Sequence, residues 1–452
     1  MTLRKRRILF YGLFALFLVM GTGIAFYAQG WRFDLGTFKT EKVGAIYVES
    51  YPENAEITLN GKSIQNASGF LSHGTLISNL FPKRYVLSLK APGYDAWTEN
   101  ATVAPTLVTE MKYAVLIPSN ASSASPAANV KDFFEAGGNV VTGSSDGTIA
   151  RATTTLARGT IISHGSDFAT IVTRSAQGTY SAYDLLNGTS TNLSALFASA
   201  GVARNSVSAV IANPYDDASI FVKTPRKFYA IDLAGGGAHN TMTAFATAPV
   251  GESLEAPLAI SSSWLAWAQY ETASDTSQIM IYDPFSGDTI DSSLSIPGTV
   301  TSLKWIRSTL IGILDSNGSL YRYDIPSETL TKMADDVKSF YPTDDGSTVA
   351  ALEGRSIEIF SLTLPADQGG YYRFNLPDMG SVRSLGWYRD NSHLFVVYPT
   401  HVNFLDLADL SVRNFTEISA LAAETDPFYD SSRNSLYLID QGGKLIRFDF
   451  PN

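Results

Sequence analysis

The segment 143–147 has the residue types of a hydrolase nucleophile, because it reads Gly-Ser-Ser-Asp-Gly and fits the pattern G-x-S-x-G. In enzymes that use this pattern, the serine sits on a sharp turn that follows a strand and precedes a helix. Here a β-type run at residues 148–153 follows the second glycine instead. We therefore predict a hairpin turn at this position and no catalytic serine.

Metal-ligating and acid–base residues are present but scattered. Acidic pairs at 216–217, 335–336 and 344–345 could act as general acid and base or bind calcium, yet none lies in a D-x-D-x-D-G loop. Cysteine is absent, which excludes disulfides, thiolate metal sites and cysteine nucleophiles. The histidines show no H-E-x-x-H or H-x-H spacing; they are His73, His164, His239, His393 and His401.

A phosphate-binding loop is suggested by Gly61-Lys62-Ser63, but Glu56 stands where the first glycine of that loop belongs. We therefore expect no catalytic residue, no cofactor and no metal. A carboxylate active site assembled from distant segments stays open, because sequence spacing does not reveal it.

Composition predicts a folded, acidic body of more than one domain. The chain has 452 residues, of which 45% are hydrophobic and 17% charged. The net charge is −10, and the first 28 residues carry only the basic Arg4, Lys5, Arg6 and Arg7. The remaining 29 basic and 43 acidic residues leave a balance of −14. Nucleic-acid binding requires a basic footprint, so it is not expected.

The run from residue 8 to residue 27 is uncharged and apolar, and about 20 helical residues cross a bilayer. The basic cluster Arg4, Lys5, Arg6 and Arg7 precedes it, which predicts a cytoplasmic N-terminus by the positive-inside rule. We expect a cytoplasmic segment at 1–7, a single-pass signal anchor in the cell membrane at 8–28 and a juxtamembrane spacer at 29–42. Everything after the anchor is then extracytoplasmic. A cleaved signal peptide ending near Gly23-Ile24-Ala25 is the alternative.

Residues 43–118 are predicted to form a small β-sandwich. Alternating apolar runs at 45–50, 55–59, 85–89 and 108–116 are typical of strands. Pro52-Glu53-Asn54-Ala55 is expected to be a turn, and Asn60-Gly61 a tight hairpin. This segment resembles a PEGA domain, a small bacterial envelope β-sandwich, over about residues 43–117. The residues that carry the resemblance are Pro52, Glu53, Asn54, Ala55, Gly61, Pro82, Gly93 and Tyr94.

The resemblance has departures, since Asn54 stands in the glycine place of the tetrapeptide and Lys83 follows Pro82 where a glycine is usual. The motif residues make turns and packing contacts, so the resemblance speaks to fold. What it implies about function is a surface-attached module that contacts envelope components.

A linker and a repeat follow. Residues 119–129 read SNASSASPAAN, which is typical of a flexible linker. Beyond it, the pattern G-x-apolar-x-x-apolar-D recurs from Gly178 to Asp184, from Gly318 to Asp324 and from Gly443 to Asp449. Looser copies end at Asp232, Asp283, Ser361 and Asp406, and a compressed copy spans 147–153.

The repeat predicts an all-β body in which residues 130–452 form a β-propeller of seven or eight blades. Copies spaced by 31 to 51 residues, with further strand-like runs between them, are the mark of that fold. A glycine with positive φ can start each strand, and the terminal Asp can accept hydrogen bonds from the next turn. The ring is expected to close with a strand from the N-terminal end of the domain. This half resembles bacterial propellers of the WD-like or TolB-like kind.

These features predict a membrane-anchored extracytoplasmic binding or scaffold protein of the bacterial cell envelope. Its propeller would be the platform for a polysaccharide or a protein. A propeller hydrolase or lyase acting on extracellular glycans is the first alternative. A sensor subunit that works with a partner membrane protein is the second.

Overall fold

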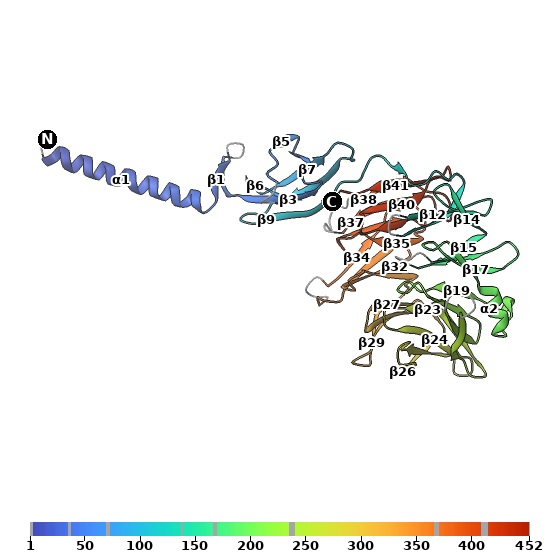
Figure 1. The fold of residues 1–452 in the computed structure, drawn as a ribbon. Helices are drawn as coiled ribbons and strands as arrows, with labels where there is room; N and C mark the ends of the chain where they lie inside the picture. The colour runs from blue at the N-terminus through green and yellow to red at the C-terminus, as the bar shows by residue number, and fades with distance from the viewer. Residues whose placement is uncertain are drawn as a thin grey trace.

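The chain, in a computed structural model, consists of a helix, a small domain and a large domain that follow one another in space (Figure 1). The structure describes residues 3–34, 38–68, 73–136, 139–165, 170–234, 240–365, 370–407 and 415–451. The all-β prediction for the body is confirmed, with short antiparallel sheets making up nearly all of it.

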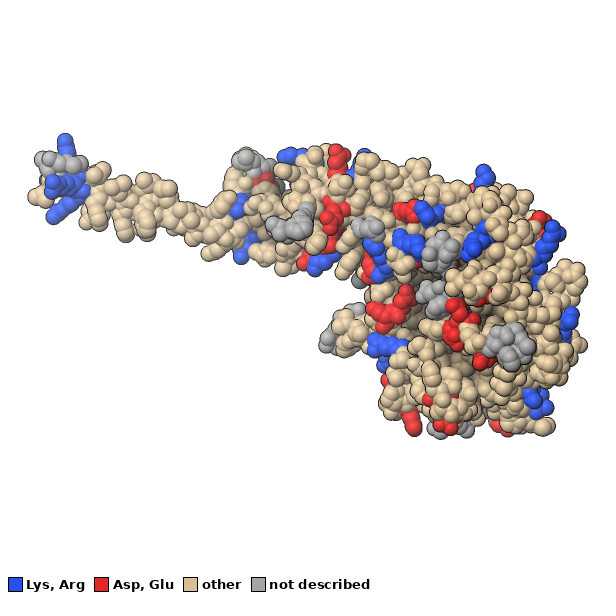
Figure 2. Space-filling view, viewed as in Figure 1, with Lys and Arg blue, Asp and Glu red and all other residues tan. Residues whose placement is uncertain are grey.

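Helix α1 (Leu3–Ala28) contains both the basic cluster and the apolar run. It is the one helix of the described chain that is long and apolar enough to cross a membrane. None of its residues is buried against the rest of the protein. Its 26 residues extend about 39 Å at 1.5 Å per residue, enough for a hydrocarbon core of about 30 Å. Figure 2 shows the basic side chains gathered at its free end and no charge along its apolar part.

The predicted juxtamembrane spacer contains a β-hairpin. Strands β1 (Trp31–Asp34) and β2 (Lys39–Lys42) pair antiparallel directly after α1. The Arg32 guanidinium lies 3.5 Å from the centre of the Tyr27 ring and donates hydrogen bonds to the Tyr27 carbonyl and to Asn79 Oδ1. One side chain thus joins the end of α1, the hairpin and the small domain.

The small domain is a sandwich of two sheets, as predicted. One sheet has the order β6-β3-β9 and the other β5-β4-β7-β8. Alternate residues of the strands face a common core that includes Ile46, Leu87 and Trp97. The strands are β3 (Gly44–Tyr51), β4 (Glu56–Leu59), β5 (Lys62–Ile64), β6 (Thr75–Leu80), β7 (Arg84–Lys90), β8 (Trp97–Thr102) and β9 (Val108–Val115).

The turns of the small domain lie where the sequence predicts them. Asn60 and Gly61 both have positive φ, 49° and 75°, as a two-residue hairpin of this type requires. Pro52 to Ala55 form the turn between β3 and β4, and Ala55 is fully buried. Gly93 also has positive φ, at the turn before β8.

Eight four-stranded sheets make up the described part of the large domain, which fixes the propeller at eight blades. The first four are β11–β14 (Val130–Ala136, Asn139–Ser144, Thr148–Arg151, Thr154–Arg158), β15–β18 (Thr160–His164, Thr170–Arg174, Tyr180–Asp184, Thr189–Asn192), β19–β22 (Ala209–Ala212, Ser219–Lys223, Lys227–Asp232, Thr241–Thr247) and β23–β26 (Glu252–Ile260, Leu265–Glu271, Thr276–Tyr282, Thr289–Pro297).

The next three blades repeat the same up-and-down order, and the eighth has three strands from the C-terminal end. These are β27–β30 (Val300–Arg307, Leu310–Asp315, Leu320–Asp324, Thr329–Ala334), β31–β34 (Ser339–Pro342, Thr348–Glu353, Ser356–Ser361, Tyr371–Asn375), β35–β38 (Ser384–Trp387, His393–Val397, His401–Asp406, Phe415–Ala420) and β39–β41 (Phe428–Asp430, Ser435–Ile439, Leu445–Asp449).

The repeated sequence pattern is the third strand of each blade. Its starting glycines Gly178, Gly318 and Gly443 have φ of 76°, 83° and 69°. The terminal aspartates act as predicted in four copies, because main-chain N–H groups of the next turn donate to Asp184, Asp232, Asp283 and Asp324. Asp449 instead accepts from the Ser435 hydroxyl and from Arg447.

Ring closure corrects the linker prediction. Ser122–Ser123 form β10, which pairs with β41 and completes the eighth blade. Ala124 N–H donates to the Leu445 carbonyl at 3.0 Å, and Ala124 and Ala127 pack on the same blade. The predicted flexible linker 119–129 is therefore bound to the propeller over this stretch. The open edge of a three-stranded blade needs main-chain partners, and any short polar strand supplies them.

One helical element inside the propeller was not predicted. Helix α2 (Leu193–Ser199) and the 3₁₀ turn η1 (Arg204–Ser206) lie between the second and third blades. Asn192 caps α2 by accepting a hydrogen bond from Ala195 N–H at 3.1 Å. Leu193 and Phe197 bury its apolar face among the blade residues.

Candidate functional site

The small domain and the propeller share one hydrophobic cluster. Val115 and Ile117 leave the end of β9 and are 4% and 6% exposed. They pack with aromatic and aliphatic residues of the last two blades, and Tyr51 of the small domain borders the same cluster. The propeller side of the cluster consists of Tyr388, Phe395, Val397, Val402, Phe404, Leu421, Leu436, Leu438, Phe448 and Phe450.

Main-chain hydrogen bonds fix the path of the chain through this joint. Asp95 N–H donates to the Ile117 carbonyl at 2.8 Å, and Leu116 N–H donates to the Tyr51 carbonyl at 2.9 Å. Ser119 N–H donates to the Gly93 carbonyl at 3.0 Å. The strand that connects the two domains is therefore held on both sides until it reaches β10.

A buried histidine lies at the border of the joint. His393 is 1% exposed, its Nδ1 lies 2.7 Å from Asp390 Oδ2, and its Nε2 lies 3.8 Å from Asp406 Oδ2. Its ring stacks on Phe404 with 4.8 Å between centroids. Burial alone would lower the pKa of His393, but the hydrogen bond and charge of Asp390, together with the charge of Asp406, raise it above the ordinary value.

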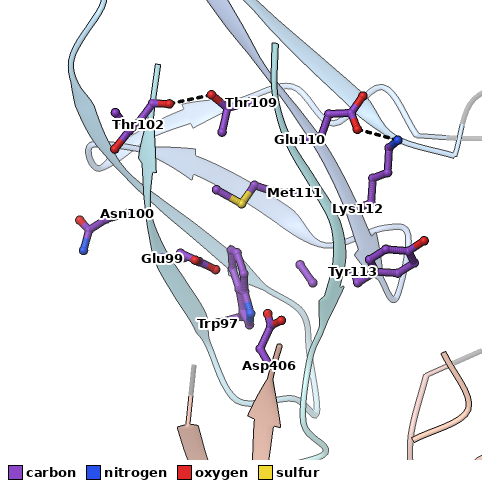
Figure 3. A pocket seen from close by; sticks show the side chains of 11 residues that line it. Trp97, Glu99, Asn100, Thr102, Thr109, Glu110, Met111, Lys112, Tyr113 and Asp406 are labelled. Atoms are coloured by element: carbon purple, nitrogen blue, oxygen red, sulfur yellow. Dashed lines mark hydrogen bonds and ion pairs between the residues drawn. The ribbon is translucent and has the colours of Figure 1, made fainter. Parts of the chain in front are cut away.

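A cleft opens beside the joint, between the edge strands of the two sandwich sheets (Figure 3). Strand β8 forms one wall and β9 the other, and Asp406 at the end of β37 closes one end. At the opposite end, the Thr109 hydroxyl donates to the Thr102 carbonyl at 2.7 Å. The cavity measures about 270 Å³. Ten of its lining residues belong to the small domain, and Asp406 comes from the propeller.

The cleft combines acidic and apolar side chains. Glu99 and Asp406 are 3% and 5% exposed, and Figure 3 shows the Trp97 ring between their carboxylates. Met111 projects into the cavity from β9. Lys112 lies on the rim and pairs with Glu110. Asp406 also lies 3.8 Å from His393 Nε2, so the acidic end of the cleft faces the buried histidine of the joint.

The propeller has a pocket of its own, about 390 Å³, at the first strand of the first blade and the loop before β39. Asp132 and His164 both line it, and the His164 ring stacks on Phe134 with 4.0 Å between centroids. Burial raises the pKa of the Asp132 carboxyl and lowers the pKa of His164. Both shifts favour the neutral forms, so the two groups can exchange hydrogen bonds with a polar ligand.

The residues that sequence analysis weighed for chemistry lie apart. Residues 143–147 contain the end of β12 and the hairpin turn that leads into β13, so the predicted turn is confirmed. Asp216 and Asp345 accept hydrogen bonds from turn N–H groups, and Asp335 pairs with Lys332. His239 lies outside the described residues. Among the residues that the structure describes, no group of three histidine, aspartate or glutamate residues could hold a metal ion.

Sequence reasoning missed the cleft. Asp406 was expected only to end a repeat strand, and Trp97 and Glu99 were not considered as a pair with it. One signal was available, because Trp97, Glu99 and Ala101 alternate as the inward face of a strand, and a glutamate at a core-facing position is unusual.

Comparison with known proteins supports the resemblance of the small domain to a known family. Residues 43–116 match the family model of the PEGA domain. No curated protein matches the chain. Among solved structures, the oligogalacturonate lyase of Vibrio parahaemolyticus is similar over 73% of this chain and 98% of that chain, with 10% identity and a TM-score of 0.45. A likeness at that level establishes neither a shared activity nor a shared substrate. The comparison thus confirms the PEGA resemblance at 43–116 and leaves the kind of propeller unassigned.

Proposed function

We propose that this chain is a membrane-anchored extracytoplasmic scaffold of the bacterial cell envelope that holds its propeller in a fixed orientation as a binding platform. The observation that carries the proposal is the hydrophobic cluster shared by Ile117 and the last two blades. Domains joined by polar contacts move relative to one another by default, whereas a continuous apolar core holds them together. A fixed joint suits a binding platform, because the ligand-binding surface of the propeller then keeps one orientation relative to the membrane anchor.

The N-terminal end supports the membrane part of the proposal. The apolar part of α1, residues 8–27, is costly in water, because its side chains remain unburied. A bilayer covers such a helix, and the basic cluster at its start favours the cytoplasmic side. The PEGA match directly after the helix fits a domain that works close to the outer surface.

The pocket at Asp132 and His164 supports a polar, uncharged ligand such as a glycan. Its walls include Phe134 and Phe428, and Phe428 is 39% exposed. An aromatic face beside hydrogen-bonding groups suits a sugar ring, whereas an anionic polymer would be repelled by the acidic body. Binding at an anchored protein gains from local concentration, so a weak contact can suffice.

The fixed orientation is tested with paired spin labels, which the cysteine-free chain accepts at chosen sites only. The pair Lys62→Cys and Thr189→Cys places one exposed label on each domain, and Thr189→Cys with Thr329→Cys is the control pair within the propeller. We expect distance distributions of similar width in the full chain in lipid nanodiscs. A clearly broader distribution for the pair across the joint would contradict the proposal.

A hydrolase or lyase is the second candidate, favoured by one observation. Asp132 and His164 lie in one pocket, and burial raises the pKa of Asp132 and lowers that of His164; perturbed pKa values of this kind are frequent at catalytic sites. The full chain in nanodiscs should retain purified cell-wall glycan and release no soluble product. Release of product that is lost in Asp132→Asn, with retention unchanged, would replace the binding role by catalysis.

A further inference from the structure

The hairpin that follows α1 has two chemically different faces. Strands β1 and β2 pair with Trp31 opposite Lys42 and Phe33 opposite Thr40. Residues that lie opposite each other in a sheet share a face, and so do residues two apart in one strand. We call the face with Trp31 and Phe33 the aromatic face. The other face is charged at every position and consists of Arg32, Asp34, Lys39 and Glu41.

Phe38, which directly precedes β2, extends the aromatic face. Its ring meets the Phe33 ring edge to face, with 6.3 Å between the two centroids. Phe33 is 53% exposed and Phe38 is 78% exposed. Large aromatic side chains gain most from burial, so two neighbouring rings at this exposure indicate a surface that something outside the protein covers.

The two faces of the hairpin meet different parts of the molecule. On the aromatic face, the Trp31 ring contacts the Phe26 ring of α1, with 6.2 Å between centroids. On the charged face, the Arg32 side chain donates a hydrogen bond to Asn79 of the small domain and also reaches back to Tyr27 at the end of α1. The small domain therefore lies on the charged side, and the aromatic side continues the apolar surface of α1.

The direction of the hairpin places its aromatic face at a bilayer surface. In Figure 1, β1 runs across the axis of α1 instead of continuing along it. Membrane-spanning helices tilt by only about 20° on average from the bilayer normal, so an element across that axis lies close to the membrane plane. Elements with one aromatic and one charged face are typical of the lipid–water boundary. Cover on one face also suits a two-stranded hairpin, which is marginally stable in water alone.

We propose that the hairpin β1–β2 lies on the bilayer surface from which the small domain projects, with Trp31, Phe33 and Phe38 inserted among the lipid head groups. The inference rests on the membrane anchor of the proposed function and adds a second contact with the same bilayer. Lys42 shares the aromatic face, with its Nζ 5.6 Å from the centre of the Trp31 ring. Its ammonium group can reach a lipid phosphate while its apolar stem stays beside the rings.

The test places spin labels on the two faces of β2 in the full chain in lipid nanodiscs. Thr40→Cys labels the aromatic face and Lys39→Cys the charged face; both positions are exposed, and the chain has no cysteine of its own. Power-saturation EPR compares collisions with oxygen, which concentrates in lipid, and with a water-soluble nickel complex. We expect the Thr40→Cys label to favour oxygen, at a depth of about 5–10 Å, and the Lys39→Cys label to favour the nickel complex. Equal preference at the two positions would overturn the proposal.

Removing the two exposed rings should release the hairpin from the lipid. With the label at Thr40→Cys, the double variant Phe33→Asn and Phe38→Asn should lose its oxygen preference and match the Lys39→Cys label. Phe285→Asn is the matched control, because Phe285 is 85% exposed on the fourth blade, and it should change nothing. Thermal melting shows that each variant is folded. An unchanged oxygen preference in the folded double variant would refute insertion through these rings.

Two further measurements separate this contact from the anchor and from a contact between proteins. A label at Phe17→Cys, within the apolar part of α1, reports the anchor by itself. Oxygen preference there without oxygen preference at Thr40→Cys would leave the anchor standing and refute the hairpin contact. Nanodiscs that hold one chain or two chains test a second copy as the occupant, and we expect the same result in both. Shielding of the Thr40→Cys label only in nanodiscs with two chains would mean that protein, and not lipid, covers the aromatic face.

Discussion

The small domain is attached at both ends, and the two attachments have opposite chemistry. Toward the membrane, Arg32 joins α1, the hairpin and Asn79 through a cation–π contact and exposed hydrogen bonds. Toward the propeller, Val115 and Ile117 enter a shared apolar core. Exposed polar contacts contribute little to stability, whereas buried apolar ones contribute much. The difference indicates a molecule that bends near the membrane and stays fixed beyond it.

The largest effect should come from breaking the propeller joint with Ile117→Asp. Loss of a buried isoleucine costs about 2–5 kcal/mol, and a buried carboxylate adds to that cost. We expect the distance distribution between labels at residues 62 and 189 to broaden strongly. Val108→Asp is the control, because Val108 is 50% exposed at the start of β9. Equal widths for Ile117→Asp and the unchanged chain would show that the apolar cluster does not fix the joint.

The second largest effect should come from weakening strand β10, which continues the attachment of the small domain to the propeller. Ala124→Pro removes the N–H that donates to the Leu445 carbonyl. We expect a loss of about 1–3 kcal/mol in the unfolding free energy of the propeller, since a buried carbonyl loses its partner. Denaturant unfolding measures it, and Ala121→Pro, at an exposed position before β10, is the control. A loss of the same size in the control would mean that closure by β10 is unimportant.

The propeller joint should also respond to pH through His393. Its pKa is raised in the folded protein by Asp390 and Asp406. The stabilisation is therefore fully present below the unfolded pKa of about 6.5 and is lost as the pH rises through the higher folded value. We expect the melting temperature to fall across that window in the unchanged chain. His393→Gln should reduce this pH dependence, whereas His73→Gln, at an exposed site, should leave it intact. The same pH slope in His393→Gln would assign it to other groups.

The comparison of the two attachments also explains what the sequence could predict. Side-chain patterns revealed the repeat strands. The glycines that start them, such as Gly178 and Gly443, have positive φ, and buried positions alternate along each strand. Turn residues such as Asn60-Gly61 were equally readable. Strand β10 was not, because Ser122 and Ser123 act through their main chain and their side chains look like those of a linker.

The candidate site was not predictable for a different reason. Glu99 and Asp406 come from distant parts of the chain, and only the docking of the two domains brings them to one cleft. The hairpin β1–β2 was missed because each strand has only four residues: β1 alternates Trp31 and Phe33 with polar residues over too short a run, and β2 is polar throughout. Pairing between domains depends on their shapes, and shape is not a local property of sequence.

The smallest effect should come from the membrane-side attachment. Arg32→Ala removes the contact with the Tyr27 ring and the bonds to the Tyr27 carbonyl and Asn79. An exposed cation–π contact is worth about 0.5–1 kcal/mol, so the melting temperature of the small domain should barely change. The orientation should change more than the stability, because Arg32 connects three elements, and the Phe26–Trp31 ring contact and the hydrogen bond from Val43 N–H to the Gly30 carbonyl remain in the variant.

The measurement is the distance between labels at Thr40→Cys and Lys62→Cys, both exposed, in nanodiscs. We expect a distribution that is already broad in the unchanged chain and somewhat broader in Arg32→Ala. Lys39→Ala, on the paired strand, should not alter it. The unchanged chain could instead give a distance distribution as narrow as the one across the propeller joint. The membrane-side attachment would then be as rigid as the propeller joint. In that case, the contrast between exposed polar contacts and buried apolar contacts would not decide where this molecule bends.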